Sequence, residues 1–327
     1  MSKNIPLTLA CGDYEIVRAL KEGAVKPDGI DLTVLTAMDS STRHWRFLRN
    51  NEFDAAECSG SGYLAAFDRG MPFRAIPVFP HRRFRHGFIF INTKKGIKKP
   101  ADLIGRKVGV KAFMVTATLW LRGILEHEYG VPHKSIEWFS EIDNDVAFTP
   151  PKDLKLTRLP NSKSAETMLA EGELDALLHS DLIDGLGTDP RIGRLFSDYK
   201  KEEIGYFQKT GIFPIMHVLG IRAEIVERYP WAPVNLYAAF NAAKEAGMKR
   251  MENPRIAPLA WYREAWEEQE AILGRDPWEY GLTGQNRKNM ETLANYSHEQ
   301  GLISRKIPFE ELFLDMSQGF KRGGFRI

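Results

Sequence analysis

Short apolar runs with strand-like character alternate with amphipathic, helix-like stretches along this chain. The strand-like runs occupy residues 5–10, 30–35 and 53–57, and helical spacing of apolar residues marks residues 16–22 and 41–50 between them. Strands that alternate with helices are typical of a mostly parallel β-sheet with both faces covered by helices. The sequence therefore predicts an α/β fold.

The same alternation starts again in the middle of the chain. Strands are predicted at residues 108–111 and 174–178, with helices at residues 116–129 and 164–170. A chain of 327 residues is long enough for two domains that each bury a core. We therefore expect two lobes of similar construction.

One short string supports this repetition. Residues 51–55 (NEFDA) match residues 172–176 (GELDA), and each string lies between a predicted helix and a predicted strand. The two strands that follow both end near a serine, Ser59 or Ser180. We interpret the match as one supersecondary unit used once in each lobe.

The last third of the chain is predicted to be mainly helical. After an apolar, strand-like run at residues 211–222, helical spacing marks residues 233–251, 258–273, 287–300 and 309–316. The apolar run offers a return of the chain to the first lobe. We predict a discontinuous first lobe at residues 1–93 plus 212–327, which includes these C-terminal helices, and a second lobe at residues 94–211.

Composition and charge exclude several classes of protein. Hydrophobic residues make up 43% of the chain and charged residues 27%, as in an average globular protein. The near balance of 45 Lys and Arg against 43 Asp and Glu argues against a general nucleic-acid-binding surface. No apolar run is long enough for a membrane helix, and the N-terminal residues lack the apolar core of a secretory signal. We expect a cytoplasmic protein, and self-association is left open.

Three loops after predicted strands are suited to binding anions. They are residues 12–14, 59–62 and 113–116. Helix N-termini present free N–H groups and a positive dipole end, and Ser59, Ser61 and Thr116 add hydroxyl donors. Ordinary capping of the following helix explains each loop equally well.

The most unusual string in the chain is the basic run at residues 81–86 (HRRFRH). Its three arginines, Arg82, Arg83 and Arg85, can each bind a carboxylate through two parallel hydrogen bonds. The alternative interpretation is a solvated surface loop.

Three histidines are candidates for proton transfer, because imidazole gives and takes protons near neutral pH. His217 lies inside the apolar run at residues 211–222, His86 closes the basic run, and His179 follows a second-lobe strand. From the residues alone, His217 fits a core histidine somewhat better than a catalytic one.

Two further strings resemble the type II periplasmic binding proteins. Residues 98–110 (KKPADLIGRKVGV) are similar to the segment that enters the second lobe there, and residues 171–176 are similar to a later helix-to-strand junction. The resemblance implies a two-lobed clamshell, with mixed, mostly parallel sheets, that holds a small organic anion between its lobes.

A narrower resemblance covers nearly the whole chain. Residues 80–86, 120–131 and 211–217 are similar to the 4,5-dihydroxyphthalate decarboxylase family. This resemblance implies a cytosolic carboxy-lyase that converts 4,5-dihydroxyphthalate to protocatechuate without oxidation. Each carboxylate of that substrate is para to a hydroxyl, so removal of the hydroxyl proton prepares the carboxylate-bearing carbon for protonation.

The resemblance also implies roles for the candidate residues. Arg83 and Arg85 are expected to hold the carboxylate that stays, with Arg82 as a further binding residue. Glu57 or His86 is expected to take the hydroxyl proton. His217 is expected to protonate the ring carbon, which reverses the preference for a core histidine. The remaining substrate-binding candidates are Ser59, Ser61, Thr116 and His179.

We expect no cofactor, because the phenolate of the substrate itself accepts the electrons. A divalent metal is the alternative, with ligands from His86, His179 and His217 together with Glu57 or Asp181. No His-x-x-x-His or Cys-x-x-Cys spacing supports such a site, and no P-loop or dinucleotide-binding motif is present.

Two other functions remain open on the same scaffold. One is a non-catalytic receptor or sensor that binds a small organic anion. The other is an enzyme of different chemistry, as in the thiamine-pyrimidine synthases that resemble this fold and consume a histidine of their own.

Overall fold

The computed structural model of this protein describes residues 4–316 of the 327-residue chain. The described residues divide into two compact units. Unit 1 contains those within Met1–Arg82, Ile215–Met290 and Ile307–Ile327, and unit 2 contains Arg83–Pro214 and Glu291–Lys306. The chain thus forms unit 1 from three separate segments.

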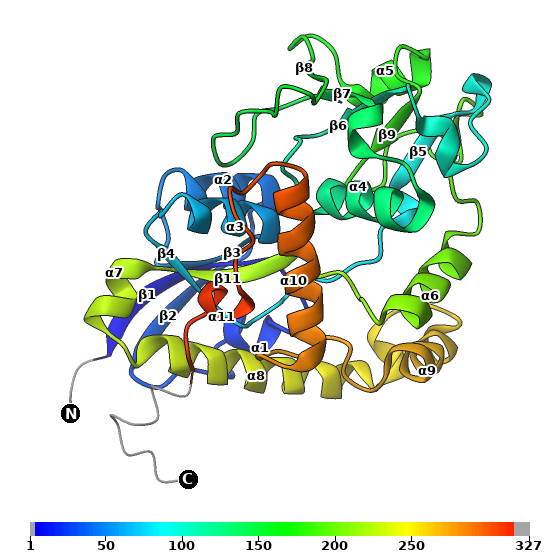
Figure 1. Ribbon diagram of the computed structural model, residues 1–327. Coiled ribbons are helices and arrows are strands. Elements are labelled where there is room, and N and C mark those ends of the chain that lie inside the picture. Colours follow the sequence, from blue (N-terminus) through cyan, green and yellow to red (C-terminus); the bar gives the residue numbers. More distant parts are fainter. Residues whose placement is uncertain (1–3, 317–327) are drawn as a thin grey trace. The chain divides into compact units, whose positions relative to one another are not determined.

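Unit 1 is built on a five-stranded sheet in the order β2-β1-β3-β11-β4 (Figure 1). Its strands are β1 (Ile5–Ala10), β2 (Ile30–Leu35), β3 (Ala55–Ser59), β4 (Phe73–Ile76) and β11 (His217–Arg222). Strand β1 pairs in parallel with β2 and β3, whereas β11 runs antiparallel to β3 and β4. The predicted strands at residues 5–10 and 30–35 are confirmed to the residue, and the run at 211–222 forms a strand only from His217 onward.

Helices cover both faces of this sheet, as predicted. Figure 1 shows α2 and α3 above the sheet and α8 below it. The helices of unit 1 are α1 (Arg18–Lys21), α2 (Ser40–Leu48), α3 (Gly60–Asp68), α7 (Ala223–Arg228), α8 (Ala232–Met251), α9 (Tyr262–Leu273) and α11 (Phe309–Leu312). Helix α10 (Gly284–Glu299) begins in unit 1 and ends in unit 2. At Gly247 of α8 a Cβ would lie 2.5 Å from the carbonyl oxygen of Glu15, so only glycine lets the helix approach this loop.

Unit 2 contains a six-stranded sheet in the order β10-β5-β9-β6-β7-β8. Its strands are β5 (Ile89–Asn92), β6 (Lys107–Val110), β7 (Glu137–Ser140), β8 (Leu156–Arg158), β9 (Ala176–Leu178) and β10 (Ile192–Arg194). The four strands from β9 to β8 are parallel, and β5 and β10 introduce the antiparallel pairs. Strand β5 differs from the sequence expectation, which assigned residues up to 93 to the first lobe, because its backbone pairs with β9 and β10.

The matching strings at residues 51–55 and 172–176 occupy equivalent positions in the two units. Each leads into a strand, β3 or β9, that lies between a parallel neighbour and an antiparallel one. The Asp54 carboxylate accepts the backbone N–H of Thr8 at 2.8 Å, and the Asp175 carboxylate accepts that of Lys107 at 2.9 Å. In both units the aspartate thus binds the backbone of the parallel neighbouring strand.

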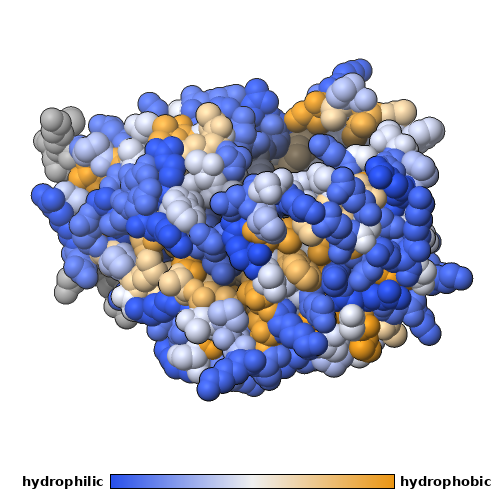
Figure 2. Space-filling model, turned by 90° about the horizontal axis from the view of Figure 1, so that it is seen from above, coloured by the Kyte–Doolittle hydropathy of each residue, from blue (hydrophilic) through white to orange (hydrophobic). Residues whose placement is uncertain are grey.

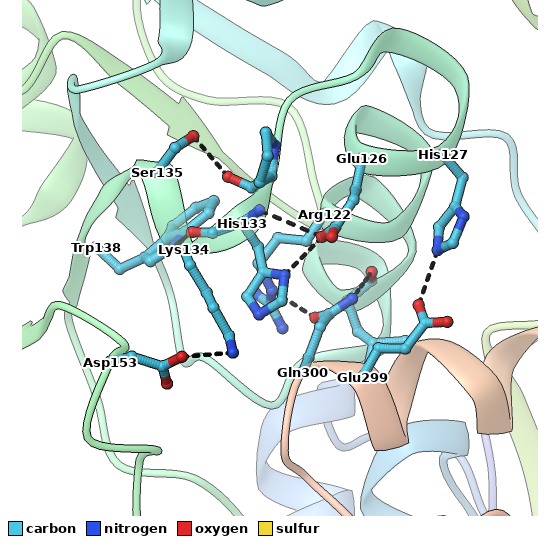
Figure 3. Close-up of polar contacts among 12 residues, drawn as sticks. Arg122, Glu126, His127, His133, Lys134, Ser135, Trp138, Asp153, Glu299 and Gln300 are labelled. Atoms are coloured by element: carbon cyan, nitrogen blue, oxygen red, sulfur yellow. Dashed lines mark hydrogen bonds and ion pairs between the residues drawn. The ribbon is translucent and has the colours of Figure 1, made fainter.

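The helices of unit 2 are α4 (Thr116–Tyr129), α5 (Ala165–Glu171) and α6 (Tyr199–Thr210), together with the end of α10. Figure 3 shows Gln300 pointing toward Arg122 of α4, and His127 pointing toward Glu299. Arg122 is buried, its Nε donates to Gln300 at 2.6 Å, and its guanidinium lies 3.8 Å from the ring centre of Phe113. Burial lowers the pKa of Arg122 to about 9. These contacts fasten the end of α10 to α4.

None of the helices within residues 4–316 combines the length and apolar character needed to cross a membrane. On the face shown in Figure 2, hydrophilic residues predominate and hydrophobic residues occur in small groups.

Candidate active site

The candidate site lies in unit 1, where strand β3 ends and strand β11 begins. The antiparallel register pairs Ser59, the last residue of β3, with His217, the first residue of β11. Alternation along β3 places Glu57 on the same face of the sheet as Ser59. The sheet therefore brings Glu57 and His217 together, although 160 positions separate them in the sequence.

Glu57 is fully buried and accepts hydrogen bonds at both carboxylate oxygens. Its Oε1 accepts from the Tyr14 hydroxyl at 2.8 Å and from Nδ1 of His217 at 2.5 Å. Its Oε2 accepts from the backbone N–H of Gly12 at 2.6 Å and pairs with Nη2 of Arg43 at 3.0 Å. The donors come from the loop after β1, from α2 and from β11, so this carboxylate of β3 joins four segments of unit 1.

The surroundings of Glu57 keep it ionised. Burial by itself would raise the pKa of its carboxyl group, because a charged group loses hydration. The adjoining imidazole of His217, the Arg43 guanidinium and the hydrogen bond from Gly12 outweigh this effect and hold the pKa below its ordinary value. A carboxylate so engaged orients a neighbouring imidazole and stabilises its protonated form.

Gly12 is required by the geometry of this loop. A Cβ at Gly12 would lie 2.3 Å from Cζ of Tyr14, a distance that no side chain tolerates. Glycine therefore allows the Tyr14 ring to cross the backbone while the Gly12 N–H reaches Glu57. The Tyr14 hydroxyl stays protonated, because burial and the Glu57 charge raise its pKa.

Two further histidines surround His217. The ring centre of His44, on α2, lies 4.7 Å from that of His217 at an interplanar angle of 83°. The ring centre of His81 also lies 4.7 Å from that of His217, at an interplanar angle of 61°. Burial, followed by the charges of His217 and Arg43, lowers the pKa of His44 well below its ordinary value, so His44 is neutral.

The structure places the sequence-predicted residues in both units. Glu57, Ser59, Ser61, Arg82 and His217 belong to unit 1, whereas Arg83, Arg85, His86, Thr116 and His179 belong to unit 2.

In unit 1, Ser59 and Ser61 lie beside the Glu57–His217 pair at the start of α3. Ser59 caps this helix by accepting the N–H of Gly62 at 3.3 Å, and its hydroxyl lies 3.1 Å from that of Ser61. The guanidinium of Arg82 is buried and donates to the carbonyl of Glu279 at 2.7 Å and to the Asn286 side chain. Burial lowers the pKa of Arg82 to about 10. Arg82 is thus used in internal contacts of unit 1, which the sequence did not anticipate.

Three candidates of the basic run belong to unit 2. Arg85 and His86 are buried, and Arg83 is exposed. Arg85 donates to the carbonyl of Ser180 at 2.6 Å, and burial lowers its pKa to about 9. His86 packs between the rings of Phe196 and Tyr206, and burial lowers its pKa to about 4.

The two remaining candidates of unit 2 have local contacts. Thr116 is buried at the start of α4. Nδ1 of His179 accepts the N–H of Asp181 at 3.1 Å.

No group of three or more His, Cys, Asp or Glu side chains within residues 4–316 is arranged to hold a metal ion. The set suggested by sequence, His86, His179 and His217 with Glu57 or Asp181, takes its residues from both units.

Sequence reasoning did not single out four residues of this site: Tyr14, Arg43, His44 and His81. Tyr14 lies in one of the predicted anion-binding loops, and His81 opens the basic run, so both lay within flagged segments. Arg43 and His44 carried no signal, because a polar pair in an amphipathic helix is normally exposed.

The chain is similar over almost its whole length to a curated protein. It is 31% identical over 323 residues to a 4,5-dihydroxyphthalate decarboxylase from Comamonas testosteroni, which covers 96% of this chain and 97% of the relative. It is 34% identical over 179 residues to a 4,5-dihydroxyphthalate decarboxylase from Pseudomonas putida, which covers 53% of this chain and 69% of the relative. No family model matches the chain.

Solved structures of binding proteins share the fold. The alkanesulfonate-binding protein SsuA from Xanthomonas axonopodis pv. citri, bound to MOPS, superposes with a TM-score of 0.57 at 13% identity, covering 96% of this chain and 99% of that one. The periplasmic aliphatic sulphonate-binding protein SsuA from Escherichia coli gives a TM-score of 0.54 at 13% identity, covering 95% and 98%. This likeness shows the periplasmic-binding-protein-like α/β fold that the sequence predicted.

Proposed function

Because this chain belongs to the 4,5-dihydroxyphthalate decarboxylase family, a family of carboxy-lyases, we propose that it decarboxylates a hydroxylated aromatic dicarboxylate of that type. The substrate proposed is 4,5-dihydroxyphthalate and the product protocatechuate. His217 protonates the ring carbon as carbon dioxide leaves.

The hydrogen bond between Glu57 and His217 is the observation that carries this proposal. It occupies Nδ1, so Nε2 is the nitrogen left to carry a proton to a ligand, and the side chain keeps 11% exposure. The ionised, buried Glu57 binds Nδ1 and so fixes the orientation of the imidazole. In the proposed reaction, His217 delivers a proton from Nε2 to the ring carbon of the aromatic dianion.

Glu57 has a different role here from the one expected of it. Both of its oxygens already accept hydrogen bonds inside unit 1, so it is a positioning residue and not a base at the substrate hydroxyl. His86 is likewise set aside as a base, because it is buried among aromatic rings of unit 2.

The start of α3 supports binding of an anion beside His217. Ser59 is both the backbone partner of His217 and the N-cap of this nine-residue helix. A helix N-terminus favours negative charge. We propose that the carboxylate which stays on the ring lies near Ser59 and Ser61.

Incubation of purified, metal-stripped protein with 4,5-dihydroxyphthalate tests the proposed function. We expect protocatechuate and carbon dioxide in equal amounts. Liquid chromatography measures the protocatechuate that is formed. Tight binding without turnover would instead favour a non-catalytic anion-binding protein, the function of the structural relatives named above.

Arg83 is the arginine of the basic run that we propose for carboxylate binding, since Arg82 and Arg85 are buried and bonded to backbone carbonyls. We expect Arg83→Ala to raise KM by about tenfold or more with little change in kcat, because a charge-assisted contact contributes about 1.5–3 kcal/mol. Steady-state kinetics measure both constants. Arg158→Ala removes another exposed arginine of unit 2 and serves as the control. An unchanged KM for Arg83→Ala would show that Arg83 faces only solvent.

A further inference from the structure

The proposed decarboxylation also requires a base for the substrate hydroxyl, and the site so far contains none. Glu57 is fully engaged, and His44 cannot reach a ligand. His44 is 6% exposed, and its Nε2 is buried without a hydrogen-bond partner among the residues that the structure describes. The base must therefore be another group beside His217.

His81 has the position and the exposure for this task. Its ring centre lies 4.7 Å from that of His217, and its side chain is partly exposed, unlike that of His44. Nδ1 of His81 is buried, so Nε2 is the nitrogen proposed to act on a ligand. Contacts with neighbouring segments hold His81 in place, among them the hydrogen bond of its carbonyl with the N–H of Met216 at 2.9 Å. The same carbonyl accepts the N–H of His217 at 3.3 Å, and the Tyr14 ring stacks on the His81 ring at 6.0 Å with an interplanar angle of 23°.

We propose that His81 is a second catalytic residue, which takes the proton of the ring hydroxyl para to the departing carboxylate. This proposal rests on the proposed function. The two reacting positions of the substrate, the carboxylate-bearing carbon and the para oxygen, are about 4 Å apart, and near-attack geometry requires a catalytic atom within about 3–3.5 Å of each. Two imidazoles whose ring centres lie 4.7 Å apart are close enough for one to serve each of these positions.

The step balances in protons and electrons. His81 accepts the hydroxyl proton, and the oxygen lone pair moves into the ring. The carboxylate-bearing carbon takes the proton from Nε2 of His217, and a C–H bond forms. The C–C bond to the carboxylate then breaks, its electron pair restores the aromatic ring, and carbon dioxide leaves. His81 returns its proton to the phenolate, and water reprotonates His217, so each turnover consumes one proton.

The experiment compares His81→Gln with wild type on 4,5-dihydroxyphthalate across pH. At pH 7 we expect kcat/KM to fall about 10²–10⁴-fold, the usual contribution of a general base. This loss should shrink as the pH approaches about 10, where a simple phenol ionises in solution without a catalyst. A residue that only supports the fold would give a loss that does not depend on pH.

His127→Gln is the matched control, because His127 is an exposed histidine of unit 2 whose ring contacts Glu299. It should match wild type at every pH. If the wild type is active and His81→Gln has the same kcat/KM, or a kcat/KM lowered equally at every pH, the role of His81 is overturned and the proposed function stands. Absence of wild-type turnover would overturn the proposed function and this proposal together.

Discussion

Replacement of His217 by glutamine should lower kcat by about 10²–10⁴-fold at every pH between 6 and about 10, while substrate still binds. The glutamine amide can donate to Glu57 as Nδ1 of His217 does, so the local packing is kept. It carries no proton that can be transferred to carbon, and a higher pH supplies none. Steady-state kinetics and isothermal titration with substrate measure turnover and binding separately.

The pH dependence separates the two catalytic histidines. The activity of His81→Gln should recover at high pH, because the substrate hydroxyl then ionises in solvent. The activity of His217→Gln should not recover. Circular dichroism spectra that match wild type would show that His217→Gln is folded. Near-normal rates in a folded His217→Gln would remove this residue from the mechanism.

Replacement of Glu57 by leucine should lower the free energy of unfolding by about 3–5 kcal/mol, because it leaves the guanidinium of Arg43 buried without its partner. Arg43 is 2% exposed, and Nη2 pairs with Glu57 at 3.0 Å. The double variant Glu57→Leu, Arg43→Met should recover much of this loss, because no unpaired charge then remains inside. Urea unfolding, monitored by circular dichroism, measures the free energy of unfolding of the wild type, the single variant and the double variant.

Glu224→Leu provides the control for this stability measurement. It breaks an exposed ion pair with Arg222, in which Glu224 is 65% exposed, and such pairs contribute at most about 1 kcal/mol. Equal losses in Glu57→Leu and Glu224→Leu would contradict a central role for the buried carboxylate.

The stability of the wild-type protein should also depend on pH through Glu57. Its pKa is lower in the folded protein than in an unfolded chain, where the value is about 4.3. The stabilisation is therefore complete above that unfolded value and is lost as the pH falls toward the folded one. Wild type should lose more stability than Glu57→Gln on acidification below pH 5, in the same urea experiment.

Several features of the fold follow from local sequence. The apolar runs at residues 5–10 and 30–35 and the helix at residues 116–129 have the predicted bounds, because their periodicity is strong and their ends carry clear turn or cap signals. The short strands β4, β7, β8 and β10 were not predicted. Each has three or four residues, too few for a period of two to be visible.

The residues of the candidate site divide in the same way. The sequence by itself determined that Glu57 belongs to a strand, that His217 lies in an apolar strand and that His81 opens a basic run. These are properties of neighbours along the chain. The predicted strand at residues 53–57 lies two residues too early, because β3 runs from Ala55 to Ser59. The match of residues 51–55 with residues 172–176 indicated a repeated unit, and the structure shows that the aspartate of each string binds the parallel neighbouring strand.

Only the tertiary structure decided which of these groups meet and what each can do. Antiparallel pairing of β11 with β3 places His217 against Glu57 across 160 positions of sequence, and α2 brings Arg43 and His44 to the same point. Burial and contact with these partners then make Glu57 an ionised support for His217 instead of a free base. Charge, hydration and distance depend on neighbours in space, and a linear pattern does not contain them.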